Sequence, residues 1–260
     1  REIYSRAAKK LKRVALELGS KNPLLVMEDA DIDLAVEGIL FGAFGTSGQR
    51  CTATSRVLVH EKVYAEVMDQ LVRRTRGLRV GDPLDPSVDM GPVCGRDQEQ
   101  KILRYIDIGL KEGAKLICGG KKLTGGDYDK GFFIEPTIFE ATHGLRINKE
   151  EIFGPVLSVI KVGNYEEAIA VANDVDFGLS SSIYTRDINK AYRAIDDLET
   201  GITYINAPTI GAEVHLPFGG VKNTGNGARE AGSAAIAEFT EIKTVFIDYS
   251  GKLQKAQIER

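Results

Sequence analysis

Helix-like and strand-like hydrophobic patterns alternate along the whole chain, and this alternation constrains the fold more than any other feature. Short apolar or period-two runs, which are typical of β-strands, are separated by stretches with the 3.6-residue period of helices. Strands that alternate with helices usually form a mostly parallel sheet with helices on its faces. The sequence therefore predicts an α/β fold with a twisted, mostly parallel sheet flanked by helices.

The same patterns predict individual elements. Helices are expected at residues 1–11, 34–46, 61–76, 97–112, 165–175 and 188–198. Strands are expected at residues 13–18, 23–27, 55–60, 115–118, 180–185, 202–205 and 244–249. Asp29 and Asp31 are N-cap candidates for the second helix, which is apolar nearly all round and is expected to be buried. The last predicted strand is isolated in the chain, so it is a candidate to join a sheet of a partner subunit.

Charge and composition narrow the possible partners. The 34 basic and 37 acidic residues give a net charge of -3, which provides no attraction to nucleic acid or to an anionic membrane. No apolar run reaches the length of a membrane span, and the first residues lack the apolar core of a signal peptide. The three cysteines have neither a disulfide pattern nor metal-ligand spacing. We expect a cytoplasmic protein with no metal, whose partners are small molecules or copies of itself.

Cys51 follows the predicted Gly-rich helix after a short loop, and this position suits a nucleophile. Nearby peptide N–H groups would favour the thiolate over the thiol. A thiolate attacks carbonyl carbon readily, and the adduct can lose hydride to a nicotinamide. From the residues alone, the alternative is a small apolar side chain in a core, which is common for cysteine.

Four motifs set this cysteine in a wider context. They are Leu-Glu-Leu-Gly-Ser-Lys-Asn-Pro at 16–23, Gly-Gln-Arg-Cys at 48–51, Glu-Glu-Ile-Phe-Gly-Pro-Val at 150–156 and Pro-Phe-Gly-Gly-Val-Lys at 217–222. In this order and spacing they resemble the aldehyde dehydrogenase superfamily over essentially the whole chain. The resemblance implies an aldehyde dehydrogenase-like catalytic domain that uses NAD or NADP.

The resemblance also implies roles for matching residues. Cys51 corresponds to the nucleophile, which forms a thiohemiacetal and then a thioester, and its backbone N–H to part of an oxyanion hole. Glu17 corresponds to the general base that activates water for hydrolysis of the thioester. For an isolated glutamate, the alternative is a charge at a strand end that faces solvent.

Further residues correspond to cofactor contacts. Glu151 is similar to the residue that binds the hydroxyls of the nicotinamide ribose, and Phe153 to the one that packs beside the nicotinamide. Gln98 and Lys101, which lie one helical turn apart, and Leu18 are additional cofactor-binding candidates. Without the resemblance, these residues would read as a solvated acidic turn, a buried aromatic residue and a charged helix face.

The chain departs from the family pattern at two points. Ser20 stands where a second glycine is usual, and a positive φ there would cost about 1 kcal/mol and tilt Glu17. Family members are about twice as long, and their N-terminal half supplies most of the dinucleotide-binding domain and an oxyanion-hole asparagine. We therefore expect residues 1–18 to be the tail of that domain, 19–232 the catalytic domain and 233–260 a bridging or oligomerisation arm. A chain of this extent would be a fragment that is inactive by itself.

Several readings stay open. The expected reaction converts an aldehyde, NAD(P)+ and water to a carboxylic acid, with transfer of the acyl group to coenzyme A as a rival that Glu17 disfavours. Homodimers or homotetramers are expected. A non-catalytic assembly half and a degenerate homologue kept for binding are alternatives from another class. The aldehyde is not specified, although Arg50 or His215 could meet a distal carboxylate.

Overall fold

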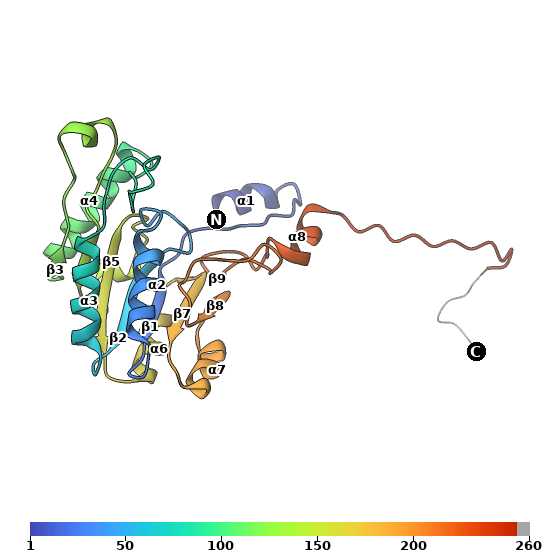
Figure 1. Ribbon diagram of the computed structural model, residues 1–260. Coiled ribbons are helices and arrows are strands. Elements are labelled where there is room, and N and C mark those ends of the chain that lie inside the picture. Colours follow the sequence, from blue (N-terminus) through green and yellow to red (C-terminus); the bar gives the residue numbers. More distant parts are fainter. Residues whose placement is uncertain (254–260) are drawn as a thin grey trace.

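A seven-stranded sheet organises residues 1–253, the part of the chain that the computed structural model describes (Figure 1). The strand order is β3-β4-β5-β2-β1-β7-β8, and every neighbouring pair is parallel except β3 and β4. The strands are β1 (Asn22–Val26), β2 (Thr54–His60), β3 (Lys115–Cys118), β4 (Thr137–Glu140), β5 (Val156–Val162), β7 (Ser180–Tyr184) and β8 (Ile202–Ile205). The expected mostly parallel α/β fold is confirmed, and its antiparallel edge strand is β3.

Helices cover both faces of this sheet. The helices are α1 (Glu2–Ala8), α2 (Ile32–Phe44), α3 (Tyr64–Arg76), α4 (Arg96–Lys111), α5 (Arg146–Lys149), α6 (Tyr165–Asn173), α7 (Ile188–Asp197) and α8 (Gly232–Phe239), with a short 3-10 helix η1 (Gly126–Lys130). Of these, α1 and α8 lie away from the sheet and have no buried residue (Figure 1). A separate antiparallel pair joins β6 (Phe177–Gly178) to β9 (Val221–Lys222). Within residues 1–253, no helix combines the length and apolar character needed to cross a bilayer.

Two apolar cores lie on opposite faces of the sheet because successive strand residues point to opposite sides. Leu24 and Val26 of β1 pack with buried residues of α2 and α3. Leu25 of β1 packs on the other face with buried residues of α6 and α7. Strand β1 is therefore buried on both faces, which explains why it is a continuous apolar run rather than an alternating one.

Helix α2 lies unusually close to the sheet. Its N-cap is Asp31, whose side chain accepts a hydrogen bond from the Leu34 N–H at 3.2 Å, as predicted. A Cβ at Gly38 would lie 1.9 Å from the Tyr184 hydroxyl, so only glycine permits this approach. Most of the helix is buried, as expected, but Phe41 is 56% exposed.

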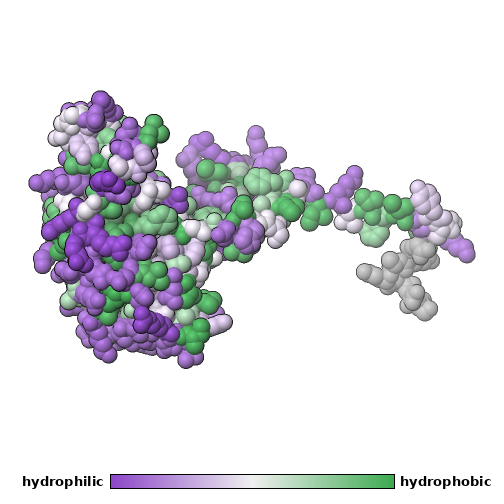
Figure 2. All heavy atoms as spheres, viewed as in Figure 1, coloured by the Kyte–Doolittle hydropathy of each residue, from purple (hydrophilic) through white to green (hydrophobic). Residues whose placement is uncertain are grey.

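Two predicted strands do not form. Residues 13–18 contribute only one isolated bridge, from Glu17 to Gly225, because the segment 224–226 beside them bonds to them largely through the Asn226 side chain and not through a continuous backbone ladder. Residues 244–249 have no regular structure, and apolar side chains such as Phe246 (94% exposed) line this extended arm (Figure 2). The period-two pattern correctly indicated extended backbone, but a strand also requires a partner. Whether 244–249 join a partner's sheet stays a prediction.

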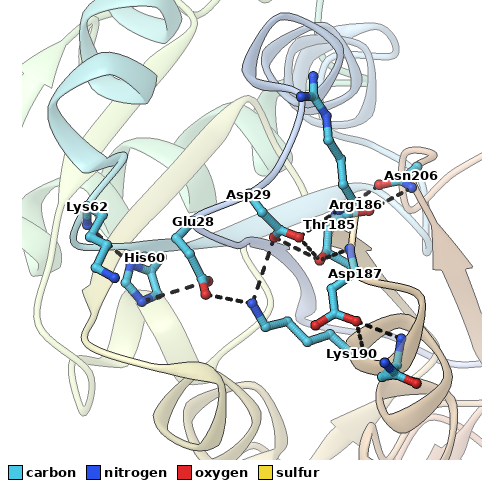
Figure 3. A network of polar contacts seen from close by, with 10 residues as sticks. Glu28, Asp29, His60, Lys62, Thr185, Arg186, Asp187, Lys190 and Asn206 are labelled. Carbon is cyan, nitrogen blue, oxygen red and sulfur yellow. Dashed lines mark hydrogen bonds and ion pairs between the residues drawn. The ribbon is translucent and has the colours of Figure 1, made fainter.

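The carboxyl edge of the sheet carries a polar network whose charges are matched within the chain (Figure 3). Glu28, which follows β1, pairs with Lys190 of α7 at 2.6 Å. The Asp29 carboxylate accepts hydrogen bonds from the Thr185 hydroxyl, at 2.8 and 2.9 Å, and from the Arg186 N–H at 3.0 Å. His60 lies 3.9 Å from Glu28. Ligands of open parallel sheets usually bind at this edge, but these groups tie elements together instead.

Candidate functional site

Three of the predicted site residues, Cys51, Glu151 and Phe153, converge at the opposite, amino edge of the sheet. The other predicted residues, Glu17, Leu18, Gln98 and Lys101, are not among those that line the pocket which these three share. Strands β1, β2, β5 and β7 are parallel neighbours, so the segments that lead into them meet at one edge. Cys51 precedes β2, Glu151 precedes β5 and Lys21 precedes β1. These three residues line one narrow pocket together with Arg50 and Phe153.

The loop before Cys51 has a strained, tightly packed backbone. Ser47 and Gly48 both have positive φ, 54° and 64°. A Cβ at Gly48 would lie 2.1 Å from the Gly154 carbonyl oxygen, so glycine is required where this loop meets the loop before β5. The chain thus places the Cys51 loop directly against the loop that carries Glu151 and Phe153.

Asn22, the first residue of β1, fixes the position of Cys51. Its Nδ2 donates hydrogen bonds to the carbonyl oxygens of Cys51 and Ala53, each at 2.8 Å. Its Oδ1 accepts from the Ser20 hydroxyl at 2.6 Å and from the Ser180 N–H at 3.1 Å. The buried amide of Asn22 therefore joins the beginnings of β1, β2 and β7 to the loop that carries Cys51.

The Cys51 thiol reaches the pocket surface but is not a ready thiolate. Burial raises the pKa of the thiol, and the negative charges of Glu17 and Glu151 act in the same direction. Backbone hydrogen bonds from Thr52 and from Cys51 itself lower the pKa, as the sequence predicted, but they are outweighed. The pKa of the thiol therefore shifts in the direction opposite to the expectation that the surroundings favour the thiolate.

Glu17 has the properties of a general base near neutral pH. Burial, followed by the charge of Glu230, raises its pKa from 4.5 to about 7, while Arg229 opposes the shift. Both carboxylate oxygens are buried and accept no hydrogen bond from residues 1–253. A Cβ at Gly219 would lie 2.8 Å from Glu17 Oε1, so the absence of a side chain in the 217–222 motif makes room for this carboxylate. The alternative of a solvent-facing charge at a strand end is excluded by this burial and by the absence of the strand.

Glu151 and Phe153 both lie at the Cys51 pocket. The Glu151 carboxylate accepts a hydrogen bond from the Ser20 N–H at 2.9 Å and lies over Gly19, where a Cβ would be 2.5 Å from Glu151 Oε2. Phe153 has a φ of 60°, which is rare for an aromatic residue and is typical of functional loops. A carboxylate and an aromatic side chain beside a thiol are suited to a ribose and a flat ring.

The weaker cofactor candidates have other contacts. Gln98 donates from Nε2 to the carbonyl oxygens of Ile152 and Phe153, at 2.9 and 2.7 Å, and so supports the Phe153 loop. Lys101 is partly buried in α4. The Leu18 N–H donates to the Thr224 carbonyl at 2.8 Å, and its 43%-exposed side chain is outside the group that lines the Cys51 pocket.

Ser20 does not strain the backbone. It has no positive φ, and its hydroxyl donates to Asn22. The serine in place of the usual glycine therefore strengthens the buried network around Asn22. The predicted tilt of Glu17 has no cause at this position.

The sequence reasoning assigned no role to three buried polar residues: Asn22, Lys21 and Arg56. Arg56 is completely buried and donates three hydrogen bonds, from Nε to the Lys21 carbonyl at 3.0 Å and from its two terminal nitrogens to Val171 and Ala172 at 2.9 and 2.8 Å. A charged residue inside an apolar strand run is the signal that could have found it, since such residues are rarely buried without a purpose.

Comparisons with known proteins agree with this geometry. The aldehyde dehydrogenase family model matches residues 1–245, and the chain belongs to this family. It is 46% identical over 233 residues to an alpha-ketoglutaric semialdehyde dehydrogenase of Bacillus subtilis, covering 89% of this chain and 48% of the relative. It is 45% identical over 251 residues to a betaine aldehyde dehydrogenase of Brucella anthropi, covering 95% and 51%.

Solved structures show the same fold. A betaine aldehyde dehydrogenase of Staphylococcus aureus in complex with NAD+ superimposes with a TM-score of 0.88 at 36% identity, covering 92% of this chain and 47% of that one. PnpE in complex with nicotinamide adenine dinucleotide superimposes with a TM-score of 0.92 at 35% identity, covering 96% and 51%. The chain spans about half the length of the relatives it matches.

Proposed function

We propose that this chain is the catalytic half of an NAD(P)-dependent aldehyde dehydrogenase, with Cys51 as the nucleophile and Glu17 as the general base. The observation that carries the proposal is an exposed Cys51 thiol in the same region as a carboxylate, Glu17, whose buried oxygens accept no hydrogen bond from residues 1–253 and whose pKa is raised to about 7. The negative charge of Glu17 acts on the Cys51 thiol and raises its pKa.

The chemistry follows from these two groups. The Cys51 thiol releases its proton to solvent, and the sulfur bonds to the aldehyde carbon to form an ionised thiohemiacetal. When bound, the dinucleotide supplies the nicotinamide that accepts hydride from this adduct. The resulting thioester is attacked by a water molecule whose proton Glu17 takes, and the C–S bond breaks to release the carboxylic acid and the thiol. The backbone N–H of Cys51 can donate a hydrogen bond to the alkoxide oxygen that develops on the substrate carbon bonded to the Cys51 sulfur.

The residues at the pocket fit a dinucleotide. The Glu151 carboxylate can accept hydrogen bonds from ribose hydroxyls, and Phe153 offers an aromatic face beside the thiol. The Gln98 side chain donates a hydrogen bond to the Phe153 carbonyl oxygen and so supports the loop that carries Phe153. We assign residues 1–18 to the tail of the dinucleotide-binding domain, 19–232 to the catalytic domain and 233–260 to an oligomerisation arm, and place the protein in the cytoplasm.

The substrate class is an aldehyde. Two relatives are named for a semialdehyde and for betaine aldehyde, which differ in charge beyond the reacting carbon. Arg50, whose side chain is exposed at the pocket, could contact a distal carboxylate. This contact favours semialdehydes among the candidates for this chain.

We also propose self-association into a homodimer or homotetramer. Strand β8 is the last strand of the sheet, and among residues 1–253 it pairs only with β7. The extended segment 244–249 leaves Val245, Phe246 and Tyr249 exposed. An unpaired apolar segment and a free sheet edge in one molecule are complementary between two copies.

The test is a dehydrogenase assay on the natural gene product that contains these residues. Wild type, Cys51→Ala and Cys118→Ala are compared with a panel of aldehydes, with NAD+ and NADP+, and with water or coenzyme A as acyl acceptor. We expect reduced cofactor from wild type and from the Cys118→Ala control, and none from Cys51→Ala. Turnover that requires coenzyme A would instead favour acyl transfer. No turnover by wild type would favour the assembly-half or degenerate-homologue reading.

A further inference from the structure

The loop that carries Cys51 is tied to a segment distant in sequence, residues 91–98. The Ser47 hydroxyl donates a hydrogen bond to the Gly91 carbonyl oxygen at 2.8 Å, and Gln49 Oε1 accepts one from the Cys94 N–H at 3.0 Å. Because a backbone N–H can only donate, the Gln49 side chain acts as an acceptor in this bond. The proposed reaction uses neither Ser47 nor Gln49, so their bonds to segment 91–98 call for a physical reason.

The same segment holds the loop that carries Phe153. Gln98 Nε2 donates hydrogen bonds to the carbonyl oxygens of Ile152 at 2.9 Å and of Phe153 at 2.7 Å. These two bonds engage both amide hydrogens of Gln98, so its amide nitrogen has none left to donate to a ribose. They also hold a backbone that is intrinsically unfavourable, since Phe153 has a φ of 60°.

Close packing joins the same three segments. Val93 and Ile152 are buried in one apolar cluster. A Cβ at Gly154 would lie 2.4 Å from Ile102 Cδ1 of α4, and a Cβ at Gly48 would lie 2.1 Å from the Gly154 carbonyl oxygen. Residues 46–51, 91–98 and 150–155 therefore each contact the other two segments.

The proposed reaction depends on the spacing of two of these segments. Hydride leaves the adduct on Cys51 and must reach a nicotinamide beside Phe153. A displacement of about 1 Å between reacting groups can slow a reaction about a hundredfold. The side chains that fasten the two loops to one common segment are therefore candidates to control the rate.

We propose that Gln49 and Gln98 are positioning residues, which fasten the Cys51 loop and the Phe153 loop to segment 91–98 at the spacing that hydride transfer requires. The inference rests on the proposed function of Cys51 and Phe153. It adds the two side chains that set the relative position of these loops.

Hydrogen–deuterium exchange of the natural gene product without a dinucleotide tests the two attachments. Gln98→Met keeps a similar shape but has no donor, so the amides of residues 150–156 are expected to exchange about tenfold faster than in wild type, as for the loss of one or two hydrogen bonds. Gln49→Met is expected to have the same effect on the Cys94 N–H. Gln100→Met, an exposed position in the same helix as Gln98, is the matched control and should exchange like wild type.

Substitution by glutamate separates the acceptor from the donor. Gln49→Glu keeps an oxygen that can accept from the Cys94 N–H, so exchange at this amide is expected to stay at the wild-type rate. Gln98→Glu has no amide hydrogen to donate, so it is expected to behave like Gln98→Met. The same substitution thus has opposite effects at the two positions.

Single-turnover mixing with NAD+ or NADP+ and an aldehyde deuterated at the carbonyl carbon measures the hydride step. Each methionine variant is expected to form reduced dinucleotide about tenfold more slowly than wild type, with a larger primary isotope effect. The double variant is expected to be about as slow as the slower single variant, because release of either loop already loses the spacing.

The outcomes separate this inference from the proposed function. Wild-type exchange and a wild-type hydride rate in both methionine variants, or losses that multiply in the double variant, would overturn the inference while the proposed function stands. Weaker dinucleotide binding by Gln98→Met with unchanged exchange of residues 150–156 would also overturn it, since that result indicates a direct ribose contact. Faster exchange along the whole chain with a lowered melting temperature would overturn it as well, because it indicates a general loss of stability. A wild type that transfers no hydride to either dinucleotide would refute the proposed function itself.

Discussion

Replacement of Asn22 by alanine is the most informative perturbation of the site's framework. Asn22 is 2% exposed and makes four side-chain hydrogen bonds, to Cys51, Ala53, Ser20 and Ser180. Each buried hydrogen bond contributes about 1 kcal/mol net, and the groups left without a partner cannot reach water. Asn22→Ala is therefore expected to lower the free energy of unfolding by about 4 kcal/mol.

Two assays read out this change. Denaturant unfolding gives the stability difference from the shift in midpoint, and iodoacetamide alkylation with peptide mapping gives the rate at Cys51 relative to Cys94 and Cys118. Because two of the four bonds hold the Cys51 loop, the alkylation rate at Cys51 should change while the rates at the other thiols do not. Asn189→Ala, on the exposed surface of α7, is the matched control and should stay within about 0.5 kcal/mol of wild type. A loss below about 1 kcal/mol with an unchanged rate at Cys51 would refute the reasoning.

Three further outcomes follow from the geometry. Gly19→Ala places a Cβ 2.5 Å from Glu151 Oε2, so the carboxylate must move, and calorimetry should show weaker NAD+ binding while a Gly77→Ala control does not. Because the pKa of Glu17 is raised to about 7, its base form appears only above neutrality, so hydrolysis of the acyl intermediate should rise with pH through about 7 in wild type. A Glu17→Gln variant should be slow and flat over that range, and an unchanged profile would exclude Glu17 as the base. Truncation after Phe239 removes the extended apolar arm, and light scattering should show a smaller assembly; an unchanged mass would exclude the arm as the oligomer contact.

Much of the fold was accessible from the sequence because hydrophobic period reports burial. The helices at 34–46, 61–76, 97–112, 165–175 and 188–198 correspond to α2, α3, α4, α6 and α7 within a few residues. Strands 137–140 and 156–162 were not predicted, although both are apolar. The second of them directly follows a motif that was read for chemistry, and its pairing to β2 and β4 depends on contacts far away in sequence.

Strand pairing was the property that local patterns could not supply. Both 13–18 and 244–249 have the alternation of strands, but the first forms only an isolated bridge to Gly225 and the second is in no strand of residues 1–253. In any extended backbone, successive side chains point to opposite sides, so these residues show a period of two without being paired in a sheet. A partner strand is a property of the assembled sheet, so one sequence segment cannot predict it.

The candidate site, like the fold, was only partly predictable from the sequence. The motifs brought Cys51, Glu151 and Phe153 to one pocket, because motif order reflects a shared fold. The electrostatics were harder to predict, since the raised pKa of the Cys51 thiol results from burial by residues distant in sequence. Asn22, Lys21 and Arg56 are buried beside residues far away in the sequence, so the spacing of residues within a short motif does not predict their surroundings.

The central claim is that Cys51 carries the acyl group and Glu17 releases it, and one measurement tests both. The natural gene product with Glu17→Gln is mixed with an oxidisable aldehyde and the dinucleotide, reduced nicotinamide is followed by absorbance, and the quenched protein is digested for mass spectrometry. We predict a burst of about one equivalent of reduced dinucleotide per site, and an acyl adduct on the peptide that contains Cys51. Steady turnover without a burst, or an adduct on Cys94 or Cys118 instead, would contradict the account.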